Sequence, residues 1–262
     1  MDPDKIKEIV KKSYDSIIEE CGSFSESPEK LCLSDELTPK DPCGGQDPGL
    51  SFESLAAIAS IQEGEIVLNL GSGVGFECFL AADNAGKNGK VIGVDASADM
   101  VEKARQNAFA KGYSNVEFRC GKLESLPVKD NSIDVVISNC IINLVPDKDK
   151  VFKEAFRVLK NGGRIVVSDT VLVKALPDFI FNSMGMYGGG VASGSGITDY
   201  VESIKRAGFT EVEVVEETSF PTDCIKNDPT LQKVIHSVGI SPETIIEMLN
   251  AAASIKVKGI KP

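Results

Sequence analysis

The sequence predicts an α/β fold built on a doubly wound, mostly parallel sheet. Three observations support this prediction: short apolar segments alternate with helical ones, a glycine-rich turn follows the first apolar segment of that series, and an aspartate ends the second. Strands that alternate with helices favour a parallel sheet with helices on both faces. Because crossovers between parallel strands are right-handed, few other topologies remain.

The elements follow one another regularly after an N-terminal segment. The predicted strands are short and apolar, and they cover residues 65–70, 91–95, 116–120, 133–139, 164–169, 211–217 and 254–261. The predicted helices show apolar residues at helical spacing or runs of good helix formers. They cover residues 5–20, 52–60, 75–86, 97–112, 147–160, 198–207 and 241–252.

Two stretches lack periodicity and interrupt this pattern. Residues 21–50 hold three cysteines and four prolines, and residues 171–196 are rich in glycine, so we expect loops in both. The chain is therefore expected to have three parts. An N-terminal helix and cysteine-bearing loop cover 1–60, a ligand-binding core covers 61–172, and a C-terminal part over 173–262 completes the sheet and the substrate side.

Composition and charge argue against several classes of partner. The formal net charge is −11 and no long basic run occurs, which disfavours nucleic acid because phosphate binding needs a positive face. The first residues show neither a signal peptide nor a transit peptide, and no apolar run approaches the roughly 20 residues of a membrane span. We expect a cytoplasmic protein that acts on a small molecule, without nucleic acid or membrane as partner.

The chain has seven cysteines and one histidine. No CxxC pair occurs, so a structural zinc site is not expected, and in a reducing cytosol the cysteines are expected to be free thiols. Cys78 and Cys120 lie in a predicted helix and a predicted strand, where packing in the core is the expected role. His236 is expected at the surface or at a helix cap.

The turn after the first strand of the core is the most informative stretch. It reads Leu-Asn-Leu-Gly-Ser-Gly-Val-Gly over residues 68–75. Gly71 and Gly73 allow the backbone to turn sharply and to approach a ligand closely. Phe76 stands where the dinucleotide-binding fingerprint has its third glycine, so the pattern is GxGxG. Such a turn alone can also be an ordinary connection between a strand and a helix.

Three further features lie at the carboxyl ends of strands. Asp95 ends the second strand, where a carboxylate can accept hydrogen bonds from both hydroxyls of a ribose, although it can also serve as a helix cap or a solvated turn. Residues 120–124 follow the third strand, and residues 138–140 end the fourth. Open α/β sheets bind ligands at this edge, so all four features indicate one site.

These residues resemble the class I S-adenosylmethionine-dependent methyltransferases over roughly residues 60–172. The resemblance implies a Rossmann-like core with S-adenosylmethionine as cofactor. The residues implied in binding it are Asn69, Gly71, Ser72, Gly73, Asp95, Ala96, Lys122, Leu123 and Asn139. Residues 71–73 would approach the methionine part, Asp95 would hold the ribose, and Lys122 and Leu123 would flank the adenine. Asn69 stands where the family usually has an acidic residue, so charge pairing with the cofactor is lost.

The stretch 136–148, with its Asn-Cys-x-x-Asn-Leu run, closely resembles the arsenite methyltransferases. The similarity extends over most of the chain after residue 60. It implies trivalent arsenic, as arsenite or methylarsenite, as substrate, and a thiol reductant as partner. Trivalent arsenic is soft and prefers thiolate ligands. Its lone pair would attack the methyl group directly, so no general base is needed.

The family pattern has three thiols, of which this sequence supplies two. Cys140 matches the thiol after the fourth strand, and Cys43 is the candidate in the loop before the first, with Cys32 as the alternative. The glycine-rich segment after the fifth strand has Gly190, or a neighbour, in place of the third. Two thiolates suit methylarsenite, which has two exchangeable ligands, and Cys224 is a further candidate.

Two other functions stay open at this point. A methyltransferase for an organic small molecule would usually need a general base, and the sequence offers no evident histidine or carboxylate pair for that role. A non-catalytic relative that keeps the cofactor fold is favoured by Asn69 and by the missing thiol, and disfavoured by Gly71, Gly73 and Asp95. In that case Cys140 would be a buried structural thiol.

Overall fold

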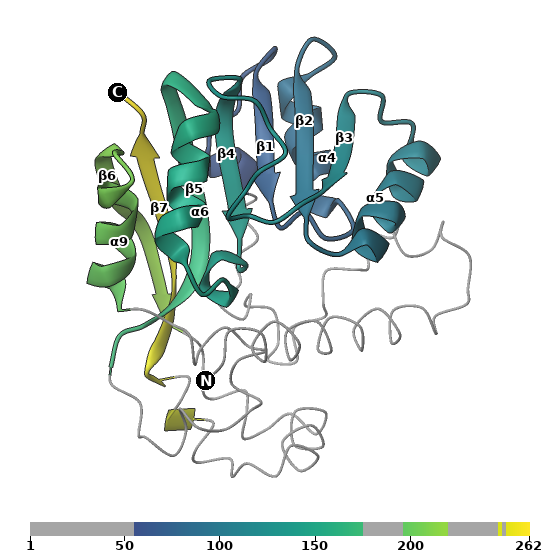
Figure 1. Ribbon diagram of the computed structural model, residues 1–262. Coiled ribbons are helices and arrows are strands. Elements are labelled where there is room, and N and C mark those ends of the chain that lie inside the picture. The colour runs from purple at the N-terminus through teal and green to yellow at the C-terminus, as the bar shows by residue number, and fades with distance from the viewer. Residues whose placement is uncertain (1–54, 175–195, 220–245, 248–249) are drawn as a thin grey trace.

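A computed structural model describes residues 55–174, 196–219, 246–247 and 250–262. Within them one seven-stranded sheet has the order β3-β2-β1-β4-β5-β7-β6 (Figure 1). The strands are β1 (Ile66–Leu70), β2 (Lys90–Asp95), β3 (Val116–Cys120), β4 (Ile133–Asn139), β5 (Leu159–Leu172), β6 (Thr210–Ser219) and β7 (Ala252–Ile260). The helices are α3 (Leu55–Ile58), α4 (Phe76–Ala85), α5 (Ala98–Lys111), the 3-10 turn η1 (Ile142–Leu144), α6 (Lys148–Val158) and α9 (Ile197–Arg206).

The sheet is parallel from β1 to β5, and β7 inserts antiparallel between β5 and β6. From β1 the chain proceeds outward to β2 and β3, whereas β4 lies on the other side of β1 and leads to β5. The strand order therefore reverses between β1 and β4. In open α/β sheets the ligand crevice lies at such a reversal, outside the carboxyl ends of the strands.

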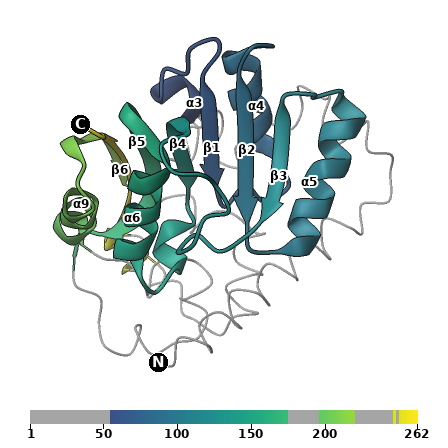
Figure 2. The same ribbon diagram turned by 45° about the horizontal axis from the view of Figure 1, so that its top comes forward.

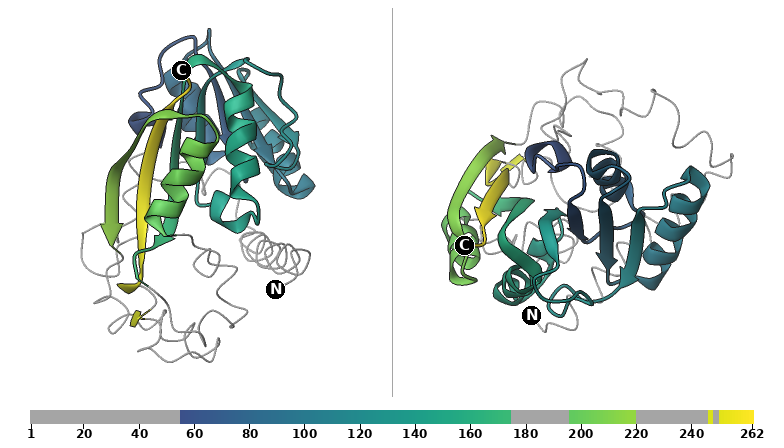
Figure 3. Two further views of the ribbon diagram at one scale, coloured as in Figure 1. Left: turned by 60° about the vertical axis from the view of Figure 1, so that its left-hand side comes forward. Right: turned by 90° about the horizontal axis from the view of Figure 1, so that it is seen from above.

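Helices cover both faces of the sheet. Side chains of β1, β4 and β5 alternate between two apolar clusters because successive residues of a strand point to opposite faces. One cluster joins the sheet to α6 and α9, and the other joins it to α3, α4 and α5. Figures 2 and 3 show α6 and α9 on one side of the sheet and α3 and α4 on the other. The predicted doubly wound α/β fold is confirmed.

Every predicted strand is present, and one differs clearly in length. β5 begins at Leu159 and ends at Leu172, beyond the predicted 164–169 at both ends. Leu159 pairs with Ile133 of β4, so α6 ends two residues earlier than a helix over 147–160 would require. The predicted helix 5–20 lies outside the described residues, as does most of the predicted helix 241–252.

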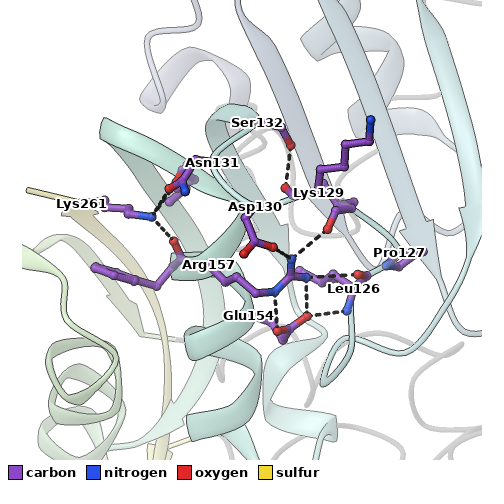
Figure 4. A network of polar contacts seen from close by, with 12 residues as sticks. Leu126, Pro127, Lys129, Asp130, Asn131, Ser132, Glu154, Arg157 and Lys261 are labelled. Atoms are coloured by element: carbon purple, nitrogen blue, oxygen red, sulfur yellow. Dashed lines mark hydrogen bonds and ion pairs between the residues drawn. The ribbon is translucent and has the colours of Figure 1, made fainter.

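A network of polar contacts fixes the loop between β3 and β4 to α6 (Figure 4). The Arg157 guanidinium donates to both carboxylate oxygens of Glu154 at 2.7 Å, to Asp130 Oδ1 at 2.5 Å, and to the carbonyls of Leu126 and Val128. Glu154 in turn accepts the backbone N–H of Leu126 at 2.7 Å. The loop that follows the predicted adenine side of the site is thereby held in place.

β6 lies at one edge of the sheet and is hydrogen-bonded to β7 alone. Every second residue from Glu211 to Ser219 is exposed, and three of these five are glutamates: Glu211, Glu213 and Glu217.

Within the described part of the chain, no helix is long and apolar enough to cross a membrane.

Candidate active site

The glycine turn after β1 contacts the segment after β4 directly. Gly71, Gly73 and Gly75 have φ angles of 72°, 51° and 100°, in the left-handed region that glycine adopts most easily. A Cβ at Gly71 would lie 2.7 Å from Ile141 Cγ1, so only glycine fits there. Residues 140–143, called the cysteine turn below, therefore lie against the predicted cofactor loop.

The glycine turn has the features of a binding loop. Gly71 and Ser72 donate their backbone N–H groups to the carbonyl of Val94 at 2.8 and 3.1 Å, which ties the turn to β2. The Ser72 hydroxyl is buried and has no hydrogen-bond partner among the described residues. A buried polar atom without a partner costs free energy, so a ligand that pairs with it is favoured. A Cβ at Gly73 would meet open space, so the turn leaves room for that ligand.

Asp95 shapes this turn from the end of β2. Its Oδ2 accepts the backbone N–H of Gly73 at 2.9 Å, and its Oδ1 accepts that of Ser97 at 2.9 Å. Each carboxylate oxygen keeps a second lone pair with which it can accept a ribose hydroxyl. The cap of α5 is Ser97, whose hydroxyl accepts the N–H of Met100. Ala96, between them, is exposed at the rim.

The residues predicted to flank the adenine differ in exposure. Lys122 is exposed, whereas Leu123 is buried in the core cluster that it shares with Leu126. An isolated antiparallel bridge joins Lys122 to Ser125 and closes this loop. Contact of Lys122 and Leu123 with the adenine stays a prediction.

Asn69 of β1 contacts α4, and its part in cofactor binding stays a prediction. Its buried side-chain amide donates to Cys78 Sγ of α4 at 3.5 Å. Burial raises the pKa of Cys78 to about 12, so this thiol is neutral and serves as a weak acceptor. The expected core position of Cys78 is confirmed. The same expectation for Cys120 was wrong: the residue ends β3 at the rim of the sheet and is exposed, with Sγ 3.8 Å from the carbonyl of Ala96.

Cys140 follows Asn139 at the end of β4 and is exposed. Its φ angle is 54°, and a residue other than glycine held there costs on the order of 1–3 kcal/mol. Its backbone N–H donates to the carbonyl of Ser168 at 2.8 Å. Partial desolvation, and to a lesser degree the charge of Asp169, raise the pKa of the Cys140 thiol to about 12. Backbone strain that the surrounding structure sustains is often found at functional sites.

Asp169 of β5 is a residue of this site that the sequence analysis did not single out. It is buried, and its carboxylate accepts the Tyr200 hydroxyl at 2.8 Å as well as the backbone N–H groups of Asn143 and Ile142. Burial raises its pKa to about 7, although these hydrogen bonds and the nearby Lys148 act in the opposite direction. The signal available in the sequence was an acidic residue at the end of the predicted strand 164–169.

Several sequence-predicted residues lie outside the described part of the chain. These are Cys32, Cys43, Gly190, Cys224 and His236. Among the described residues, the structure brings the cysteine turn together with the glycine turn and Asp95. The second thiol, the substitution at Gly190 and the position of His236 remain predictions.

The strand order, the glycine turn and the acid that ends β2 define a cofactor-binding methyltransferase fold. A sequence model of the methyltransferase-domain family matches residues 61–216, and the chain belongs to this family. S-adenosylmethionine is accordingly the cofactor of this fold, and the Ser72 hydroxyl, the open space at Gly73 and the Asp95 carboxylate fit such a ligand.

Its relatives include arsenite methyltransferases, as the sequence analysis predicted. The arsenite methyltransferase of Halobacterium salinarum is 38% identical over 244 residues, 85% of this chain and 62% of that protein. The arsenite methyltransferase of Aquipseudomonas alcaligenes is 38% identical over 165 residues, 60% of this chain and 48% of that protein. This chain therefore spans less than two thirds of the length of either relative.

A solved structure shows the same likeness. The crystal structure of an arsenic(III) S-adenosylmethionine methyltransferase from Chlamydomonas reinhardtii superposes with a TM-score of 0.60 and 29% identity. The match covers 77% of this chain and 64% of that one.

Proposed function

We propose that this protein transfers a methyl group from S-adenosylmethionine to trivalent arsenic held by Cys140 and a second thiol. The observation that carries the proposal is the position of Cys140. It is an exposed cysteine on a strained turn, and its neighbour Ile141 packs against Gly71 of the cofactor loop. The arsenite methyltransferases among the relatives support the same substrate.

The chemistry of Cys140 suits an arsenic ligand. Its raised pKa keeps the thiol protonated near neutral pH. Binding exchanges a hydroxide of arsenic for the cysteine sulfur: the As–O and S–H bonds break, the As–S bond forms, and the proton leaves with the hydroxide as water. The exchange needs no thiolate beforehand and releases no net proton. Arsenic prefers the product because sulfur is a softer ligand than oxygen.

The cofactor, when bound, supplies an electrophilic methyl group. The protein contributes position: Asp95 and the glycine turn hold one reactant, and Cys140 holds the other across the strand-order reversal. Fixing two reactants in this way can remove up to roughly 7–11 kcal/mol of the barrier in ideal cases. A small thiol is the proposed reductant that returns the methylated arsenic to its trivalent state.

The proposed substrate is methylarsenite in preference to arsenite. With Gly190 or a neighbour in place of the third family thiol, two cysteines remain for binding. We propose Cys43 as the second, with Cys32 as the alternative. Methylarsenite has two exchangeable ligands and is satisfied by two sulfurs, whereas arsenite has three.

Cys140→Ser tests the proposal, because it keeps the size of the side chain and replaces a soft ligand by a hard one. We expect the variant to lose arsenic methylation, assayed with methylarsenite under reducing conditions, and to keep its affinity for S-adenosylmethionine by calorimetry. Cys120→Ser is the matched control, since Cys120 is also exposed at a strand end, and it should stay active.

Two results would overturn the proposal. Cys140→Ser could methylate as fast as the unaltered protein, or neither arsenical could be methylated by the unaltered protein. A cysteine introduced at Gly190 should improve the use of arsenite relative to methylarsenite. Failure with both arsenicals would leave an organic small molecule as the alternative substrate.

A further inference from the structure

We propose that Asp169 and Tyr200 are positioning residues that hold the cysteine turn, and with it Cys140, in its binding conformation. The inference rests on the proposed function, in which Cys140 of this turn binds arsenic. Neither residue is required to touch arsenic or cofactor. Both act through the backbone of residues 140–143.

Three successive residues of β5 hold the turn. The carbonyl of Ser168 accepts the N–H of Cys140 at 2.8 Å, and the carbonyl of Thr170 accepts the side-chain amide of Asn143. Between them the Asp169 carboxylate accepts the backbone N–H groups of residues 142 and 143. The Ser168 and Thr170 contacts use carbonyls that any residue would supply. The Asp169 contact depends on its side chain.

Tyr200 fixes the carboxylate from the other side. It is fully buried in α9, and its hydroxyl donates to Asp169 Oδ2 at 2.8 Å. Its ring packs edge to face on Phe152 of α6, with centroids 5.5 Å apart, so the hydroxyl cannot easily turn away. The three hydrogen-bond partners of Asp169 among the described residues are all donors. An amide at this position would set an N–H group against at least one of them.

This arrangement matters because the turn is strained. Cys140 has a positive φ and would relax to a commoner conformation if the hydrogen bonds to residues 142 and 143 were lost. The thiol would then move relative to the glycine turn, which its neighbour Ile141 contacts at Gly71. The carboxylate and the tyrosine therefore set where the thiol lies.

Tyr200→Phe compared with Ser203→Ala tests the inference. Both hydroxyls are buried on α9 and both donate to an aspartate, but Ser203 donates to Asp149 of α6, away from the cysteine turn. Each variant loses one hydroxyl-to-carboxylate hydrogen bond, although Asp149 is more exposed than Asp169. The rate at which iodoacetamide alkylates Cys140 is measured without cofactor by peptide mass spectrometry, with Cys120 as the internal reference.

Tyr200→Phe should alkylate Cys140 about five-fold faster relative to Cys120, the ratio that corresponds to one net hydrogen bond. Ser203→Ala should leave the ratio unchanged. In the methylation assay Tyr200→Phe should lower kcat for methylarsenite and leave the KM for cofactor unchanged. Asp169→Asn, a second variant should Tyr200→Phe fold poorly, should show the larger effect on both readouts.

Equal alkylation ratios in Tyr200→Phe and Ser203→Ala would overturn the inference, because the contact would then be merely structural. So would an unchanged ratio in both Tyr200→Phe and Asp169→Asn. The alkylation contrast does not depend on arsenic. If it is observed while the unaltered protein methylates neither arsenical, the proposed function fails and the positioning role stands.

Discussion

Gly71 and Gly73 lie two residues apart and both have a positive φ angle, but their surroundings differ. A Cβ at Gly71 would overlap with Ile141, whereas a Cβ at Gly73 would meet nothing within 4 Å. Gly71→Ala should therefore lower the free energy of unfolding by about 2–4 kcal/mol, from overpacking together with the left-handed backbone. Gly73→Ala should cost only about 1–2 kcal/mol, from the backbone alone. Urea denaturation without cofactor measures both, and equal losses would show that Ile141 moves aside freely.

The site was predictable to the extent that its residues follow strands directly. Gly71, Asp95 and Cys140 were singled out because each stands at a strand end, and the sheet brings those ends together. Asp169 escaped notice because its side-chain partner Tyr200 is 31 residues further along the chain, in α9. No local pattern reports such a pairing. The error at Cys120 has a different origin, because Cys120 ends the predicted strand 116–120 and its position at the rim follows from that end.

At the scale of elements, Arg157 joins α6 to the loop between β3 and β4. Arg157→Ala should lower the free energy of unfolding by about 2 kcal/mol, because it leaves Glu154 and two loop carbonyls without a strong donor. Arg206→Ala is the matched control. That arginine pairs with Asp149 at an exposed position, where an ion pair contributes little to stability. Urea denaturation of the two variants tests the difference, and losses of similar size would contradict the role of the network.

Strands were easier to predict than their ends. The strands of the parallel sheet are covered by helices on both faces. Each is therefore an apolar run in the sequence, whichever strands it pairs with. The length of β5 depends on those partners. Its last residues pair with the first of β7, from Leu172 opposite Ala252 onward, and its first residue pairs with Ile133. The run Asn161-Gly162-Gly163 reads as a turn by itself, and only long-range pairing shows the full strand.

For the molecule as a whole, Asp169 links stability to pH. Its pKa in the folded protein is about 7, above its value in an unfolded chain, so the native state keeps a proton that the unfolded state has lost. This stabilisation is fully present below about pH 4 and is lost as the pH rises through 7. Between pH 5 and pH 7 the unaltered protein should lose about 2 kcal/mol more stability than Asp169→Asn.

The measurement is urea denaturation of both proteins at pH 5, 6 and 7. Other titrating groups are common to the two proteins and cancel in the difference. Parallel curves would show that the Asp169 carboxyl is ionised throughout this range. The three hydrogen-bond donors would then lower its pKa by more than burial raises it.

The acidic edge of the sheet has a consequence for how copies of the chain meet. An open strand edge offers unpaired backbone groups to any other strand, and addition of strands there leads to aggregation. β6 carries exposed glutamates at positions 211, 213 and 217, and two register shifts interrupt its pairing with β7. Glu213 pairs with Lys258 of β7 at 2.9 Å, which leaves Glu211 and Glu217 as the uncompensated charges among these three within the described part of the chain. Two such edges laid side by side would bring like charges together along their length. The repulsion opposes strand-to-strand stacking and is screened as the ionic strength rises, so this edge protects the protein against self-association best at low salt.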